Sequence, residues 1–134
     1  MIRVLVVEDS PTVRQLLVSL LEADPEIRVV GEATNGRQAV ELASQLHPDL
    51  ITMDVVMPDM DGLEATRRIM AQRPTSILIV TAHIDSPELN IAFEALKAGA
   101  LDIVAKPRVL GEELPGDWGR ELVAKVKALA NIYA

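Results

Sequence analysis

Residues 50–73 read LITMDVVMPDMDGLEATRRIMAQR and contain one complete strand–loop–helix unit. The short, mostly apolar run Leu50–Asp54 has too few residues for a helix and predicts a buried strand. The turn-forming stretch PDMDG follows, and a helix is then predicted from Gly62 to Arg73. Asp54 would therefore lie at the carboxyl end of a strand, just before a loop.

Four more units of this kind surround the first. The other predicted strands are Ile2–Val7, Ile27–Ala33, Ser76–Thr81 and Leu101–Ala105, and the other predicted helices run from Pro11 to the Asp24-Pro25 stop, Gly36 to Leu46, Pro87 to Ala98 and roughly Gly119 to Tyr133. Strands that alternate with amphipathic helices predict an α/β fold, because right-handed crossovers place helices on both faces of a parallel sheet. With five βα units, the expected architecture is a flavodoxin-like, doubly wound, five-stranded parallel sheet in the order 2-1-3-4-5.

The composition is that of an ordinary soluble protein. With 134 residues the chain is expected to form a single domain, 1–134, with an extended loop at residues 108–118 before the last helix. The net charge of −7 disfavours nucleic acid and anionic membranes as partners. The sequence has no cysteine, no signal peptide and no apolar run long enough to span a bilayer, so we expect a cytoplasmic protein.

Polar residues follow four of the five predicted strands. Glu8 and Asp9 follow the first strand, Asp54 ends the third, Thr81 ends the fourth and Lys106 follows the fifth. In open parallel sheets the ligand site lies outside the carboxyl ends of the strands, where the strand order reverses. Three carboxylates crowded there repel one another unless a hard divalent cation neutralises them, and Mg²⁺ suits a site open to phosphate.

Each of these residues also has an ordinary structural interpretation. Asp54 could cap a turn, Thr81 favours a strand by its β-branched side chain, and Lys106 could be a solvated surface residue. Their joint placement at one edge of the sheet favours a functional site over these separate explanations.

The motifs of the chain resemble those of bacterial response-regulator receiver domains over nearly its whole length. They are VVEDS (residues 6–10), MDVVMPDMDGLE (53–64), VTA (80–82) and AGALDIVAKP (98–107), in this order and at the intervals that the family shows. The resemblance implies Asp54 as phosphoacceptor, Mg²⁺ ligands from Glu8, Asp9, Asp54 and the Val56 carbonyl, and phosphoryl contacts from Thr81 and Lys106. It also implies a histidine kinase as the phosphoryl donor.

Two stretches near the end of the chain resemble the regulatory half of chemotaxis protein-glutamate methylesterases. They are FEALKAGALDIVAKP (residues 93–107) and KVKALA (125–130), and the predicted long loop lies between them. The resemblance implies a C-terminal methylesterase domain as a partner, outside this chain. A stand-alone chemotaxis regulator with one domain is the alternative within the receiver family.

Two other classes of protein match the sequence less well. An aspartate-nucleophile phosphatase also forms an aspartyl phosphate at a strand end, but it requires a second aspartate two residues later, where this chain has Val56. A flavin- or nucleotide-binding module would carry a glycine-rich loop after the first strand, and none is present there.

Several other residues carry weaker expectations. Ile103 stands where many receivers have an aromatic residue, and we expect it to be a core residue. Phe93 is expected in the core, and Trp118 is expected to be partly buried or a docking anchor. His83 is expected on an exposed loop, and Asp61 is expected to cap the helix that follows it.

Overall fold

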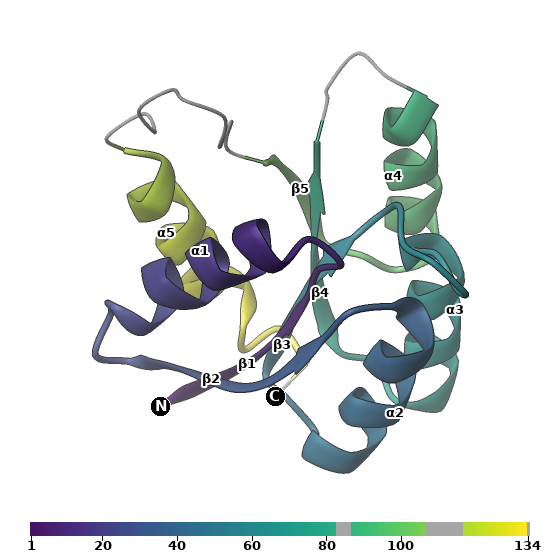
Figure 1. The fold of residues 1–134 in the computed structure, drawn as a ribbon. Helices are drawn as coiled ribbons and strands as arrows, with labels where there is room; N and C mark the ends of the chain where they lie inside the picture. Colours follow the sequence, from purple (N-terminus) through teal and green to yellow (C-terminus); the bar gives the residue numbers. More distant parts are fainter. Residues whose placement is uncertain (83–86, 107–116, 134) are drawn as a thin grey trace.

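The computed structural model describes residues 1–82, 87–106 and 117–133. Strands and helices alternate along the whole chain (Figure 1). The strands are β1 (Ile2–Val7), β2 (Ile27–Ala33), β3 (Leu50–Asp54), β4 (Ser76–Thr81) and β5 (Asp102–Ala105). The helices are α1 (Pro11–Glu22), α2 (Gly36–Leu46), α3 (Gly62–Gln72), α4 (Pro87–Lys97) and α5 (Trp118–Leu129).

All five strands pair in parallel, in the order β2-β1-β3-β4-β5. Helices α1 and α5 cover one face of the sheet, and α2, α3 and α4 cover the other (Figure 1). Two apolar clusters fill the spaces between the sheet and these two helical layers. The predicted fold class and strand order are confirmed.

Local capping signals begin the helices at the carboxyl edge of the sheet. The side chains of Ser10, Asn35 and Asp61 each accept a hydrogen bond from the backbone N–H three residues later, and Pro11 occupies the first turn of α1. Such caps satisfy N–H groups that the first helical turn leaves without partners. The expected capping role of Asp61 is confirmed.

The last helix is shorter than its sequence pattern predicts. It ends at Leu129, although we expected it to extend to about Tyr133. The Leu129 carbonyl accepts a hydrogen bond from the Ser76 hydroxyl of β4 at 2.7 Å, and a tight turn follows in which Ile132 N–H also donates to it. A contact with a distant strand therefore ends this helix, and sequence periodicity could not reveal it.

Three apolar residues test the expected core. Phe93 is 50% exposed on α4, so the prediction that it lies in the core is wrong, because only one side of this helix is covered. Ile103 is half-buried and packs against the core, as expected. Trp118 is buried at the first turn of α5. The expected exposure of His83 and residues 108–116 of the loop predicted at 108–118 lie outside the described residues, and Trp118 already belongs to α5.

Within the described part of the chain, every helix falls short of the length and apolar character that a bilayer crossing requires.

Candidate functional site

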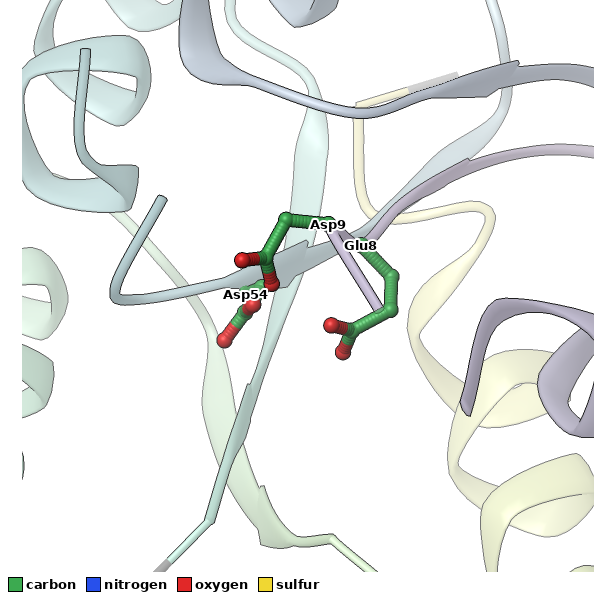
Figure 2. A group of neighbouring side chains, drawn as sticks. All are labelled: Glu8, Asp9 and Asp54. Atoms are coloured by element: carbon green, nitrogen blue, oxygen red, sulfur yellow. The ribbon is translucent and has the colours of Figure 1, made fainter. Parts of the chain in front are cut away.

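Three carboxylates gather at the carboxyl ends of the two central strands β1 and β3. The ligand oxygens of Glu8, Asp9 and Asp54 lie within 4.8 Å of one another, and Figure 2 shows the three side chains at this edge. Glu8 is fully buried and Asp54 is only 2% exposed, whereas Asp9 lies at the surface. The structure thus brings together the three acidic residues that the sequence singled out.

Lys106 supplies the positive charge that faces this cluster. Its ammonium group lies 2.9 Å from a Glu8 carboxylate oxygen and 3.0 Å from Oδ1 of Asp54. Its backbone N–H donates to the Thr81 carbonyl at 2.6 Å, which holds the end of β5 against β4. One cation cannot neutralise three carboxylates, so the cluster keeps a net negative charge.

A glycine lets α3 begin directly beside Asp54. Gly62 N–H donates to the Val55 carbonyl at 2.8 Å, and a Cβ atom at Gly62 would lie only 2.1 Å from the Asp54 carbonyl oxygen. Since non-bonded heavy atoms do not approach so closely, any side chain here would displace either the helix or the end of β3. The DG pair of residues 61–62 therefore combines a helix cap with the close approach that fixes Asp54.

The N-cap and first turn of helix α1 hold Glu8 in place. The backbone N–H of Ser10 donates to Glu8 Oε2 at 3.0 Å, and the Arg14 guanidinium donates to the Glu8 carbonyl at 3.0 Å. Arg14 also pairs with Glu32 of β2 at 3.2 Å. Sequence reasoning missed Arg14, because a single arginine in an amphipathic helix carries no signal until the fold places it beside the site.

Burial and like charges dominate the electrostatics of Asp54. Its burial, the neighbouring carboxylate of Asp9 and the negative charge of Glu8 raise the pKa of Asp54 to about 8, although Lys106 opposes this change. Burial alone would also raise the pKa of Asp9, but its close contacts with the carboxyl groups of Asp54 and Glu8 and the charge of Lys106 hold that pKa below its ordinary value. The cluster is therefore unfavourable when Asp54 is ionised and no further cation is present.

At the site, the buried oxygen atoms Asp54 Oδ2 and Thr81 Oγ1 have neither a hydrogen bond nor an ion pair among the described residues. The other carboxylate oxygen of Asp54, Oδ1, accepts from Val55 N–H at 2.8 Å and faces Lys106. Buried polar groups usually have partners, so both atoms are suited to bind a ligand. A set of carboxylate oxygens with an open side matches the ligands that a hard divalent cation prefers.

Val56, two residues after Asp54, has a half-exposed side chain in the loop that follows β3. The proposed role of its backbone carbonyl as a metal ligand stays a prediction.

The raised pKa of Asp54 makes a testable statement about stability in metal-free buffer. Between pH 4 and pH 8 the unfolded chain has lost a proton that folded Asp54 keeps, so this residue lowers the free energy of unfolding as pH rises. Asp54→Asn should therefore be more stable than the wild type by at least about 1 kcal/mol at pH 8, with a smaller difference at pH 5.

Urea denaturation at both pH values in the presence of EDTA measures this difference. Asp59→Asn is the matched control, because it makes the same change of residue at an exposed position in the neighbouring loop. A difference between Asp54→Asn and the wild type that stays the same at pH 5 and pH 8 would contradict the electrostatic description.

Known proteins are similar to this chain in sequence and fold. A protein-glutamate methylesterase/protein-glutamine glutaminase of Anaeromyxobacter dehalogenans is 53% identical over 132 residues, and one of Syntrophus aciditrophicus is 49% identical. Each alignment covers 98% of this chain, but the chain spans only 38% and 37% of the length of these relatives.

Among solved structures, the response regulator domain of Thermotoga maritima CheB superimposes with a TM-score of 0.84 and 37% identity, covering 98% of both chains. The receiver domain of a Mycobacterium tuberculosis response regulator, NarL, gives a TM-score of 0.82 with 32% identity. The response regulator receiver domain family matches residues 4–115, which include every residue of the acidic cluster and Lys106. This chain therefore belongs to the response regulator receiver domain family, and it is similar to the regulatory domain of CheB methylesterases.

Proposed function

We propose that this domain is a phosphorylation switch in which Asp54 accepts a phosphoryl group from a histidine kinase in the presence of Mg²⁺. The observation that carries the proposal concerns the two oxygens of Asp54: Oδ2 is buried and has no hydrogen-bond partner among the described residues, and Oδ1 faces the ammonium group of Lys106. A nucleophile needs one free oxygen, and developing negative charge needs a nearby cation. Asp54 and Lys106 provide both.

Glu8, Asp9 and Asp54 would hold the Mg²⁺ ion, together with the Val56 carbonyl. When bound, Mg²⁺ would neutralise charge on the carboxylates and on the phosphoryl oxygens, which is its usual contribution to phosphoryl transfer. The close spacing of the three carboxylates and the high pKa of Asp54 are consistent with a site that lacks one positive charge.

In the transfer step, Oδ2 of Asp54 would attack the phosphorus atom of a phosphohistidine. The new O–P bond forms while the P–N bond breaks, and the imidazole leaves with the electron pair. Lys106 and the Thr81 hydroxyl would donate hydrogen bonds to the phosphoryl oxygens, since both lie at the ends of adjacent strands, β5 and β4. The transition state is loose, so alignment and charge neutralisation suffice, and no general base is needed.

Hydrolysis of the aspartyl phosphate would return the switch to its resting state.

A phosphoryl group adds about −1.5 to −2 charges and new hydrogen-bond acceptors. Thr81 Oγ1, buried and without a partner among the described residues, is the group best placed to turn toward them. Such a movement would carry the signal into the end of β4.

Asp54→Asn should abolish phosphorylation, because an amide is not a competent nucleophile. Intact-mass measurement after incubation with acetyl phosphate and Mg²⁺ would show the mass increase of one phosphoryl group in the wild type and none in the variant. Asp59→Asn, which replaces an exposed aspartate in the same loop, should be labelled as the wild type is. Labelling of Asp54→Asn would mean that another residue is the acceptor.

Mg²⁺ should raise the melting temperature of the wild type, because an ion that binds only the folded state stabilises it. The increase should be lost, or nearly so, in Asp9→Asn, which removes one carboxylate of the cluster. Asp59→Asn makes the same change of charge away from the cluster and should keep the full increase. The readout is the shift that Mg²⁺ causes in each variant by differential scanning fluorimetry, and an equal shift in Asp9→Asn would remove Asp9 from the metal site.

We further propose that the domain regulates a protein-glutamate methylesterase domain located elsewhere in the same protein. The support is the name of the relatives at 53% and 49% identity and their much greater length. The surface formed by β5 and α5 would contact and occlude the esterase site before phosphorylation, and the contribution expected from residues 108–116 lies outside the described residues. Phosphorylation can release it only if the two states of the domain differ in affinity for the esterase.

Sequencing the native gene beyond codon 134 and assaying the full-length protein test this output. Esterase activity should increase on addition of acetyl phosphate and Mg²⁺, and the increase should vanish in Asp54→Asn. Three results would each reject the methylesterase output. They are a stop codon directly after codon 134, a DNA-binding domain encoded there, and esterase activity that does not respond to the phosphodonor. None of these results would affect the receiver assignment.

A further inference from the structure

The first turn of α5 makes a direct hydrogen bond to the strand end that carries Lys106. The indole N–H of Trp118 donates to the Ala105 carbonyl at 2.9 Å. Trp118 is 9% exposed and packs in the apolar cluster between the sheet and the α1–α5 layer. A buried indole N–H usually finds an acceptor, and here the acceptor is the residue immediately before Lys106.

This bond completes a clamp on one peptide unit. The Ala105 carbonyl and the Lys106 N–H belong to the same planar trans peptide, so they point in opposite directions. The N–H donates to the Thr81 carbonyl on the side of β4, and the carbonyl accepts from Trp118 on the other side. Because β5 is an edge strand, that outer carbonyl has no neighbouring strand to pair with.

Helix α5, which carries Trp118, is held near both of its ends. Beside it, Gly119 packs so closely on α1 that a Cβ atom there would lie 2.9 Å from a methyl carbon of Leu20. At its far end, α5 is tied to β4 by the Ser76–Leu129 hydrogen bond. The helix that carries the indole is thus held against both α1 and the sheet. The indole can therefore orient the Ala105–Lys106 peptide.

We propose that Trp118 is a positioning residue for Lys106, acting through the Ala105–Lys106 peptide that it clamps against β4. The inference rests on the proposed role of Lys106 as a contact of the phosphoryl group. The side chain of Lys106 must leave the backbone at a point from which its ammonium group can reach both Glu8 and Asp54. The two hydrogen bonds on the Ala105–Lys106 peptide restrict the orientation of that peptide and so help to fix this starting point.

The first test compares rates of phosphorylation. Trp118→Phe keeps an aromatic ring but removes the N–H donor, and it should lower the rate constant for labelling by acetyl phosphate about two- to tenfold. Mg²⁺ affinity should stay within about twofold, because the carboxylates do not contact Trp118. Val126→Ala is the matched control, since Val126 is fully buried in the same apolar cluster on α5 but makes no hydrogen bond to Ala105.

A structural role alone predicts a different pattern. If Trp118 only filled space, Val126→Ala and Trp118→Phe would change the rate constant equally for an equal loss of unfolding free energy. An equal effect, or no effect of Trp118→Phe on the rate constant, would overturn the proposal.

A spectroscopic readout tests the same link in the opposite direction. Trp118 is the only tryptophan of the sequence, so tryptophan emission reports this single ring. Phosphorylation of the wild type should change that emission, and Asp54→Asn should show no change. The Lys106→Ala variant, once mass measurement shows that it carries a phosphoryl group, should also keep its emission unchanged. Without the lysine side chain, the phosphoryl group no longer acts on the Ala105–Lys106 peptide.

The outcomes separate this inference from the proposed function. Labelled wild-type protein with unchanged emission, or an emission change that persists in labelled Lys106→Ala, rejects the role of Trp118 and leaves Asp54 as acceptor. A wild type that acetyl phosphate cannot label rejects both.

Discussion

Negative charge is buried at the ends of two central strands, β1 and β3, and this burial is unfavourable for folding. Glu8 and Asp54 are almost completely removed from water, and among the described residues only Lys106 forms an ion pair with them. Desolvation penalises each charge, and the carboxylates repel one another, so this cluster reduces the free energy of unfolding unless a further cation binds there. The same imbalance supports the proposal that the site binds a cation and, with that cation, a phosphoryl group.

The core of the sheet compensates for this unfavourable site. Strands β3 and β4 are buried along their whole length, and so are the last four residues of β1. Buried apolar area is the main favourable contribution to folding, at roughly 25 cal/mol for each Å². Gly62 and Arg14 then fix the strand ends that carry Asp54 and Glu8, and their contacts hold the carboxylates close together despite the repulsion.

The sequence was sufficient for those parts of the structure that local pattern and the rules of parallel sheets control. Continuous apolar strands identified the sheet, and the strand order alone brought Glu8, Asp9 and Asp54 to one edge. Contacts between elements that are distant in the sequence could not be predicted in this way. The hydrogen bond from Ser76 of β4 to Leu129 at the end of α5 is one of them. The exposure of Phe93 was also missed, because helical spacing marks an apolar face without showing whether another element covers it.

The two sides of the site differ in how firmly the sheet holds them. Glu8 and Asp54 follow β1 and β3, and each of these strands has a strand on both sides, so their ends can move only if three strands move together. Lys106 follows the edge strand β5, which has only four residues and a neighbour on one side. A change of charge at Asp54 should therefore displace β5 before it displaces the carboxylates. If the domain is the proposed switch, its signal would leave the site through β5 and α5, where the Trp118 hydrogen bond joins strand to helix.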